Sequence, residues 1–365
     1  MVAVGFAFLN AAAPIAGAAA GTMPSVVNGA SVPHSENMAG VTATAKEAVS
    51  TTAVVNGILY VNGWWGSLYA LKAATGKELW NFPTGGAGSP AVAHGVVYVG
   101  SGERNVYALN ASTGKVIWTY PTRRPVDSSP TVANGVVYVG SYDHKLYALD
   151  AHTGAEIWSY ATENPIDSSP AVVNGVVYVG SDDDSIYALN ASTGKVIWSH
   201  QTGDSVLSSP AVVDGVMYVG SWDKSVYALK ASNGAKIWIH TTINSIDSSP
   251  AVVKGVVYIG SLDNNVYALN ASTGAKIWSY TTGKSVESSP AVVNGVVYIG
   301  SDDRKVYALN ASNGKKIWAY TTGKAVPYSP AVVRGVVYIA SYDGKIYAFK
   351  ATTGHRIWSF TTVQS

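Results

Sequence analysis

An acidic residue that recurs every 40 residues is the most regular set of side chains in the chain that could do chemistry. The column consists of Glu103, Asp143, Asp183, Asp223, Asp263, Asp303 and Asp343. Carboxylates gathered in a ring could ligate calcium, which prefers oxygen donors. Each of them stands in a short polar turn, where an aspartate commonly hydrogen-bonds its own backbone. We therefore expect turn-forming carboxylates, with calcium at one or two repeats as the alternative.

Other patterns that carry chemistry are missing from the sequence. Cysteine is absent, which removes thiolate metal sites, disulfides and a cysteine nucleophile. Only His200 and His240 share a repeat position, and that position is otherwise aromatic, as at Tyr160, so a zinc site is disfavoured. No phosphate-binding loop, nucleophile elbow or H-E-x-x-H motif occurs. We predict no metal site and no catalytic residue.

A tryptophan with almost the same period defines the frame that positions these residues. The column is Trp80, Trp118, Trp158, Trp198, Trp238, Trp278, Trp318 and Trp358. The first spacing is 38 residues rather than 40, because the first connection between repeats is two residues shorter. One residue type at one position of every repeat indicates one packing environment, and we expect these side chains to be structural, packed between repeats.

The repeat at residues 169–203 illustrates the expected strands. They run over residues 170–173, 176–180, 186–190 and 195–200, and Asn174-Gly175 between the first two is a strong hairpin signal. Four short strands in a period near 40 are typical of a propeller blade. We predict an all-β, eight-bladed β-propeller of four-stranded antiparallel blades over residues 49–365, preceded by a separate segment at residues 1–48.

The connections of each blade divide over two faces, because consecutive strands alternate in direction. The Asn-Gly turn and the Asn-Ala-Ser-Thr-Gly turn barely change between repeats, and we call their side the invariant face. The turn between the second and third strands and the connection between blades vary, and they form the variable face.

Variation on a constant frame, rich in charged and aromatic residues, is typical of a binding surface, and drift in solvated loops is the alternative. The candidate binding residues are Trp64, Trp65, Arg104, Arg123, Arg124, Tyr142, His144, Asp182, Trp222, Lys224, Arg304 and Tyr342. A protein, a peptide or a glycan would suit such a face. The net charge of +2 is too small to indicate nucleic acid as a partner.

The stretch Leu-Asn-Ala-Ser-Thr-Gly-Lys-x-Ile-Trp, as at residues 189–198, resembles the tryptophan-docking motif of pyrroloquinoline-quinone (PQQ)-type propellers. The resemblance covers about residues 51–363. It implies that the tryptophan of one blade docks against the Ala-to-Gly turn of the next. The family contains quinoprotein alcohol dehydrogenases, a lipoprotein scaffold of outer-membrane β-barrel assembly, and extracytoplasmic binding domains without enzyme activity.

The repeats favour the non-enzymatic members of that family. A quinoprotein site needs one blade that differs from the others, and here no blade carries an insertion. A lipobox cysteine is absent as well, so the lipoprotein role itself is not indicated. We predict an extracytoplasmic binding or structural scaffold without a cofactor. The alternative is a PQQ-dependent oxidoreductase, which would use PQQ and calcium.

Two further features bear on export and assembly. Asn110, Asn190, Asn270 and Asn310 each begin an Asn-Ala-Ser acceptor for N-glycosylation on the invariant face, although asparagine also suits this turn by itself. Residues 1–21 are apolar and small without lysine or arginine, which resembles a secretory signal peptide lacking its basic start.

Residues 24–29 resemble the beginning of a blade. This short stretch, Pro-Ser-Val-Val-Asn-Gly, could donate a strand to a blade of another copy and build a filament at the cell surface. Deletion of residues 1–48 would then abolish assembly.

Overall fold

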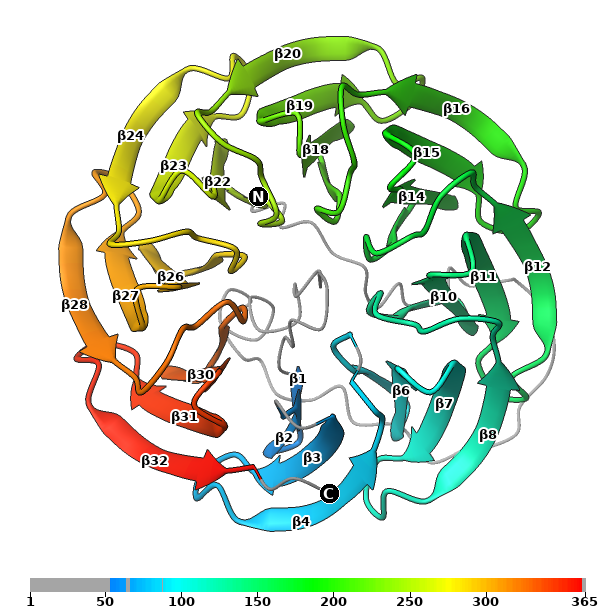
Figure 1. Ribbon diagram of the computed structural model, residues 1–365, viewed down its shortest axis with the longest axis horizontal. Coiled ribbons are helices and arrows are strands. Elements are labelled where there is room, and N and C mark those ends of the chain that lie inside the picture. Colours follow the sequence, from blue (N-terminus) through cyan, green and yellow to red (C-terminus); the bar gives the residue numbers. More distant parts are fainter. Residues whose placement is uncertain (1–52, 64–65, 87, 363–365) are drawn as a thin grey trace, which may run out of the picture.

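The computed structural model describes residues 53–63, 66–86 and 88–362, and these form eight four-stranded antiparallel sheets arranged in a ring (Figure 1). Each sheet consists of four consecutive strands, from β1-β2-β3-β4 in blade 1 to β29-β30-β31-β32 in blade 8. The predicted eight-bladed all-β propeller is therefore confirmed. The segment at residues 1–48, with its signal-like and strand-donating interpretations, lies outside the described residues, and so do Trp64 and Trp65.

The strands have the same place in every blade, counted from the centre outwards. The first strands are β1 (Ala53–Val55), β5 (Ala91–Ala93), β9 (Thr131–Ala133), β13 (Ala171–Val173), β17 (Ala211–Val213), β21 (Ala251–Val253), β25 (Ala291–Val293) and β29 (Ala331–Val333). The second strands are β2 (Ile58–Asn62), β6 (Val96–Gly100), β10 (Val136–Ser141), β14 (Val176–Gly180), β18 (Val216–Gly220), β22 (Val256–Gly260), β26 (Val296–Ser301) and β30 (Val336–Ser341). The third strands are β3 (Ser67–Lys72), β7 (Asn105–Asn110), β11 (Lys145–Asp150), β15 (Ser185–Asn190), β19 (Ser225–Lys230), β23 (Asn265–Asn270), β27 (Lys305–Asn310) and β31 (Lys345–Lys350). The outer strands are β4 (Glu78–Pro83), β8 (Val116–Pro121), β12 (Glu156–Ala161), β16 (Val196–Gln201), β20 (Lys236–Thr241), β24 (Lys276–Thr281), β28 (Lys316–Thr321) and β32 (Arg356–Thr361).

The hairpin between the first two strands has the expected two-residue turn. Asn174 and Gly175 have φ angles of 51° and 77°, as a type I′ turn requires. The same turn holds where another residue replaces the asparagine, because Arg334 has a φ of 49°. The four strands predicted for this blade differ from the observed bounds by at most one residue at either end.

Each outer strand contains a β-bulge that the repeat pattern did not predict. In blade 4, Ala188 pairs with Trp198 and Leu189 with Val196, so Ile197 is the extra residue. The shift recurs in all eight blades. A bulge increases local twist and makes the exposed edge a poorer template for another strand.

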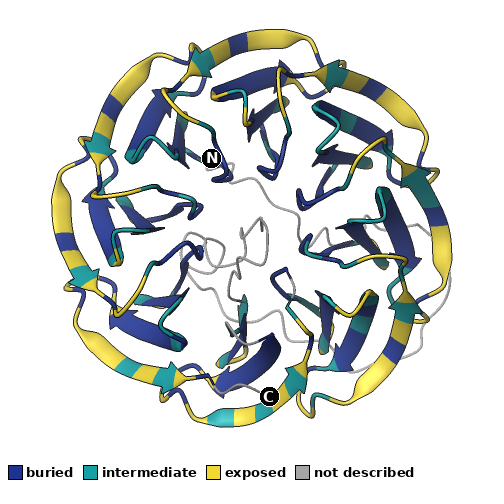
Figure 2. Cartoon of the chain, viewed as in Figure 1, coloured by how far each residue is buried: buried dark blue, intermediate teal, exposed yellow. Residues whose placement is uncertain are grey.

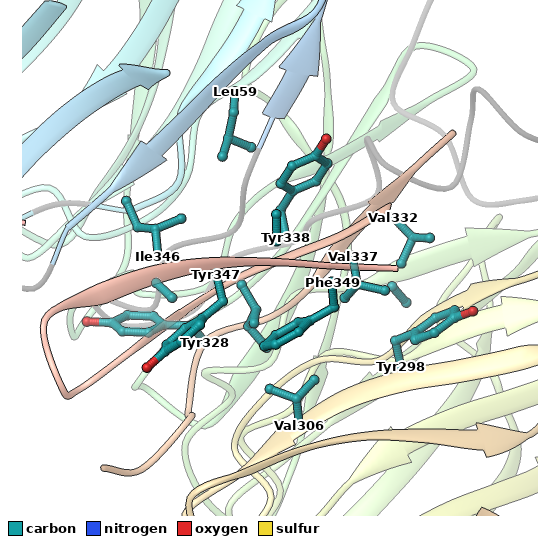
Figure 3. Close-up of a cluster of buried hydrophobic side chains, with 14 of the residues drawn as sticks. Leu59, Tyr298, Val306, Tyr328, Val332, Val337, Tyr338, Ile346, Tyr347 and Phe349 are labelled. Atoms are coloured by element: carbon teal, nitrogen blue, oxygen red, sulfur yellow. The ribbon is translucent and has the colours of Figure 1, made fainter. Parts of the chain in front are cut away.

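The core lies between blades and within their three inner strands. Figure 2 shows these strands largely buried, whereas the outer strands alternate between exposed and buried residues. Figure 3 shows one cluster that spans blades 7, 8 and 1, in which Val306, Phe349 and Leu59 represent the three blades. The ring thus closes by side-chain packing between the first and last blades, and each of these blades is built from its own four strands.

The short connection between blades 1 and 2 has its own packing solution. Later connections bury an aliphatic residue, such as Ile246, against a glycine of the preceding second strand, such as Gly220. In blade 1 the equivalent of the glycine is Asn62, which is buried and donates from Nδ2 to the Gly88 carbonyl at 2.5 Å. A larger side chain therefore stands where the shorter connection leaves room.

Candidate functional site

The tryptophan column lies at the interfaces between blades. The Trp118 indole N–H donates to the Ala151 carbonyl of the next blade at 3.0 Å. A Cβ on Gly154 would come within 2.7 Å of the same indole, so the ring lies directly on this turn. The contact recurs around the ring for Trp80, Trp118, Trp158, Trp198, Trp238, Trp278, Trp318 and Trp358, the last of which donates to Ala73 of blade 1.

The acidic column ties neighbouring blades together on the variable face. In blade 4, Asp183 Oδ1 accepts from the Ser185 N–H of its own turn at 3.1 Å. Its Oδ2 accepts from the Tyr187 hydroxyl at 2.8 Å and from the Glu163 N–H of the preceding connection at 3.1 Å. Burial, followed by this hydrogen bond to Asp183, raises the pKa of Tyr187.

The same arrangement occurs along the column. The carboxylates of Asp143, Asp183, Asp223, Asp263, Asp303 and Asp343 each accept from a tyrosine hydroxyl and from the backbone of the preceding connection. Within the described residues, no group of three or more His, Cys, Asp or Glu side chains could hold a metal ion. These six aspartates therefore clamp a tyrosine hydroxyl to the preceding connection.

The two histidines of the aromatic column lie apart, each against a tyrosine. His200 packs edge-on to Tyr227 and His240 to Tyr267, with ring centroids 5.8 and 5.9 Å apart. Partial burial lowers the pKa of both imidazoles, and a nearby lysine lowers it further. Both side chains are therefore suited to packing in the neutral form.

Acidification is expected to destabilise the fold through these histidines. A histidine whose pKa is lower in the folded state binds protons more readily when unfolded, so stability falls as pH drops below its ordinary value of about 6.5. The variant His200→Tyr/His240→Tyr carries the residue that four of the eight blades have at this position. Between pH 7 and pH 5 the Tm of this variant should fall less than that of the wild type. The difference between the two losses should not exceed about 2–4 °C, because solvent screens the charge on half-exposed rings. Equal losses of Tm in the two proteins would contradict this role.

The ten candidate binding residues that the structure describes lie on the variable face but not in one place. Four positions flank each of these junctions between two blades: one residue in a turn of the first blade, two in the connection, and one in a turn of the second. Between blades 2 and 3 these are Arg104, Arg123, Arg124 and Tyr142. Between blades 3 and 4 they are His144, Glu163, Asn164 and Asp182, and between blades 4 and 5 they are Asp184, Gly203, Asp204 and Trp222. Between blades 5 and 6 they are Lys224, Ile243, Asn244 and Leu262, and between blades 7 and 8 they are Arg304, Gly323, Lys324 and Tyr342.

Charge differs between these junctions. Asp184 and Asp204 make the junction between blades 4 and 5 acidic, and burial, then the charges of Asp204, Asp183 and Asp223, raise the pKa of Asp184. Between blades 5 and 6 two apolar side chains are exposed beside the polar Lys224 and Asn244: Ile243 is 79% exposed and Trp222, in the neighbouring turn, is 38% exposed. Ile243 is a surface residue that the repeat comparison did not single out, and its only signal is an isoleucine where other connections carry glycine or a charge.

One hollow on this face lies between blades 2 and 3. It measures about 550 Å³ and is lined by Arg104, Arg123, Arg124, Pro125, Asp127 and Tyr142, which we call the Arg groove. Four of these six residues are candidates from the repeat comparison, which missed Pro125 and Asp127. The comparison placed the four on one face, and the structure brings them to one groove.

The invariant face carries a second hollow of about 530 Å³ between blades 5 and 6, lined by residues such as Ile237, Asp214, Lys254 and Ser272. On the same face, the Asn190 Oδ1 accepts from the Thr193 N–H at 3.0 Å and so closes its own turn, as Asp150 does in blade 3. Asparagine therefore has a structural role in this turn, and glycosylation at Asn110, Asn190, Asn270 and Asn310 stays a prediction.

Both the sequence and the fold of this chain are similar to known proteins. The family model described as outer membrane protein assembly factor BamB matches residues 65–168, 146–285 and 263–365. The chain belongs to this family. No curated protein matches the chain. No helix in the described part of the chain is long and apolar enough to cross a membrane.

Solved structures similar to this member of the BamB family include a BamB, a designed protein and quinohemoprotein alcohol dehydrogenases. BamB from Moraxella catarrhalis has a TM-score of 0.68 and 21% identity, covering 85% of this chain and 96% of that one. A computationally designed protein, Ika8, has a TM-score of 0.75 and 14% identity, covering 84% and 96%. The quinohemoprotein alcohol dehydrogenase ADHIIG from Pseudomonas putida HK5 has a TM-score of 0.66 and 18% identity, covering 84% of this chain and 71% of that one. At these low sequence identities, the TM-scores show a shared fold.

Proposed function

We propose that the chain is a non-enzymatic, extracytoplasmic scaffold that binds protein partners through its variable face. One observation carries the proposal: the repeated backbone frame presents a basic groove between blades 2 and 3, acidic side chains between blades 4 and 5 and the exposed Ile243 between blades 5 and 6 on one face, while the opposite face repeats itself. Variation without selection would not be expected to gather three arginines at one groove. Membership of a family described as an assembly factor supports a role in binding proteins.

The second candidate is a PQQ-dependent oxidoreductase, which similarity in fold to quinohemoprotein alcohol dehydrogenases favours. The residues present do not fit the group that such an enzyme would hold. The aspartates of the acidic column accept hydrogen bonds from tyrosine hydroxyls and backbone N–H groups, and the described residues offer no cluster of metal ligands. The blades match one another without an insertion that could build one catalytic pocket.

An oxidation assay separates these two candidates. The purified full-length protein is incubated with PQQ and calcium and supplied with alcohols, aldoses and an artificial electron acceptor. We expect no turnover above that of free PQQ and calcium. Substrate oxidation that requires the protein would overturn the proposal in favour of an enzyme.

Self-association through residues 1–48 is a further part of the proposal. It rests on the blade-like stretch at residues 24–29, and the outer strands form an edge of all eight sheets, although their bulges make these edges poorer templates for strand addition. Particles of the full chain and of a chain lacking residues 1–48 can be compared by electron microscopy. Identical particles would remove self-association without affecting partner binding.

A further inference from the structure

We infer that the Arg groove binds an acidic peptide segment, with the guanidinium groups of Arg104, Arg123 and Arg124 pairing with its carboxylates. The inference rests on the proposed function and adds the chemistry of the partner. It places one contact of the binding face between blades 2 and 3, at a groove that has charge and shape together.

The backbone that carries the three arginines is held in place by hydrogen bonds. The Thr122 N–H donates to the Arg104 carbonyl at 2.8 Å, and the Thr122 hydroxyl donates to the Arg124 carbonyl at 2.7 Å. The Arg123 N–H donates to Asp143 Oδ2 at 2.9 Å. A ligand would therefore order only the exposed side chains, and a prepared backbone lowers the entropic cost of binding.

The positive charge of the groove is not neutralised by ion pairs within the described chain. The one salt bridge formed between described residues joins Lys305 and Asp303 at 3.9 Å, far around the ring. Asp127 also lines the groove. Asp143 accepts from the Arg123 N–H as well, so three arginines face two aspartates and leave an excess of one positive charge, which a carboxylate-bearing ligand would balance.

The geometry favours carboxylates along a peptide over a compact phosphate. Guanidinium groups pair with carboxylates through two parallel hydrogen bonds. A phosphate site usually adds several free backbone N–H groups, and here the Arg123 N–H binds Asp143, the Tyr142 N–H binds Pro125 and the Arg104 N–H binds Ser101. The arginines come from a turn and from a separate connection, so they suit charges spread along a chain.

The fold does not impose this charge on the groove. The same four positions between blades 4 and 5 hold Asp184, Gly203, Asp204 and Trp222, which gives the opposite charge on the same frame. On the same face, the junction between blades 7 and 8 carries Arg304, Lys324 and Tyr342. It has two cations rather than three, so it provides a matched control.

The test uses the full chain and a fluorescent peptide of five Glu-Gly repeats, with binding measured by fluorescence anisotropy at low salt. The variant Arg104→Gln/Arg123→Gln/Arg124→Gln should bind at least about 10-fold more weakly, since each exposed ion pair contributes roughly 2–5-fold. Arg304→Gln/Lys324→Gln and, on the invariant face, Arg334→Gln should stay within about 2-fold of the wild type. A Gln-Gly peptide should not bind. Equal urea midpoints for all variants show that they remain folded.

Three results would overturn the inference. They are an absence of binding to the wild type, equal weakening by the triple variant and by Arg304→Gln/Lys324→Gln, and displacement of the peptide by inorganic phosphate at equal concentration. The last result would identify a phosphate-bearing ligand instead. Any of these results would exclude only an acidic peptide as the ligand of the Arg groove. The proposed function is tested separately, by the PQQ oxidation assay and by cross-linking from the variable face.

Discussion

Replacement of Trp198 by alanine is expected to lower the free energy of unfolding by about 3–5 kcal/mol, the cost of removing a buried aromatic side chain. Trp198 is 8% exposed, and its indole N–H donates to the Ala231 carbonyl of the next blade at 2.9 Å. A Cβ at Gly234 would lie 2.6 Å from the ring, so the indole fills the space above this turn. Its loss leaves a cavity at one interface of the ring and removes one of two hydrogen bonds to the Ala231 carbonyl, which still accepts from the Tyr178 hydroxyl at 3.1 Å.

Equilibrium denaturation in urea measures this effect, and the adjacent bulge residue is the control. Ile197 is 48% exposed, so Ile197→Ala should cost less than about 1 kcal/mol. Blades contact mainly their neighbours, and an interface weakened in one place should lower the cooperativity of the transition. Similar losses for Trp198→Ala and Ile197→Ala would contradict the assignment of the tryptophan column to blade docking.

Overpacking at Gly220 is the second large effect that we expect. A Cβ at this position would lie 2.3 Å from Cγ2 of Ile246, which is fully buried, so Gly220→Ala should cost about 1–3 kcal/mol. Ile246→Ala alone should cost about 2–5 kcal/mol through the cavity that it leaves. The double variant should lose less free energy of unfolding than the sum of the two single losses. The methyl group added at residue 220 would partly fill the cavity left at residue 246, and that cavity would relieve the overpacking.

The double-mutant cycle is measured by urea denaturation, and its control uses a glycine in open space. Gly255 has a φ of 76° with no atom within 4 Å of a new Cβ, so any cost of Gly255→Ala should add to that of Ile246→Ala. Blade 1 shows the natural form of the compensation, since Asn62 replaces the glycine where the connection is short. Strict additivity for Gly220→Ala and Ile246→Ala would contradict this account of the connection.

The local frame could be predicted from the sequence because it depends on short-range rules. Asn174-Gly175 predicts its own hairpin, and the 40-residue period counts the blades. The bulge at Ile197 could not be predicted, since an isoleucine beside a tryptophan reads as an ordinary strand pair. Closure between blades 1 and 8 was also beyond the repeat pattern, because Trp358 and Ala73 are far apart in the chain and only the ring brings them together.

The candidate site was predictable as a face but not as grooves. Alternating strand directions place Arg104, Arg124 and Tyr142 on one side of the molecule. Their convergence depends on how a connection crosses from an outer strand to the next inner strand, which the clamp from Asp143 to the Arg123 N–H helps to determine. That contact spans 20 residues and two blades, and no periodicity in the sequence reveals it.

Site-specific photo-cross-linking in the producing cells tests most directly whether the variable face is the binding face. A photoreactive amino acid replaces Arg124 or Ile243 on the variable face, and Ser192 or Ser272 on the invariant face. All four residues are exposed, so substitution should leave the fold intact. We expect adducts with discrete proteins from Arg124 and Ile243 and none from Ser192 and Ser272. Adducts that form equally from both faces, or from the invariant face alone, would contradict the account.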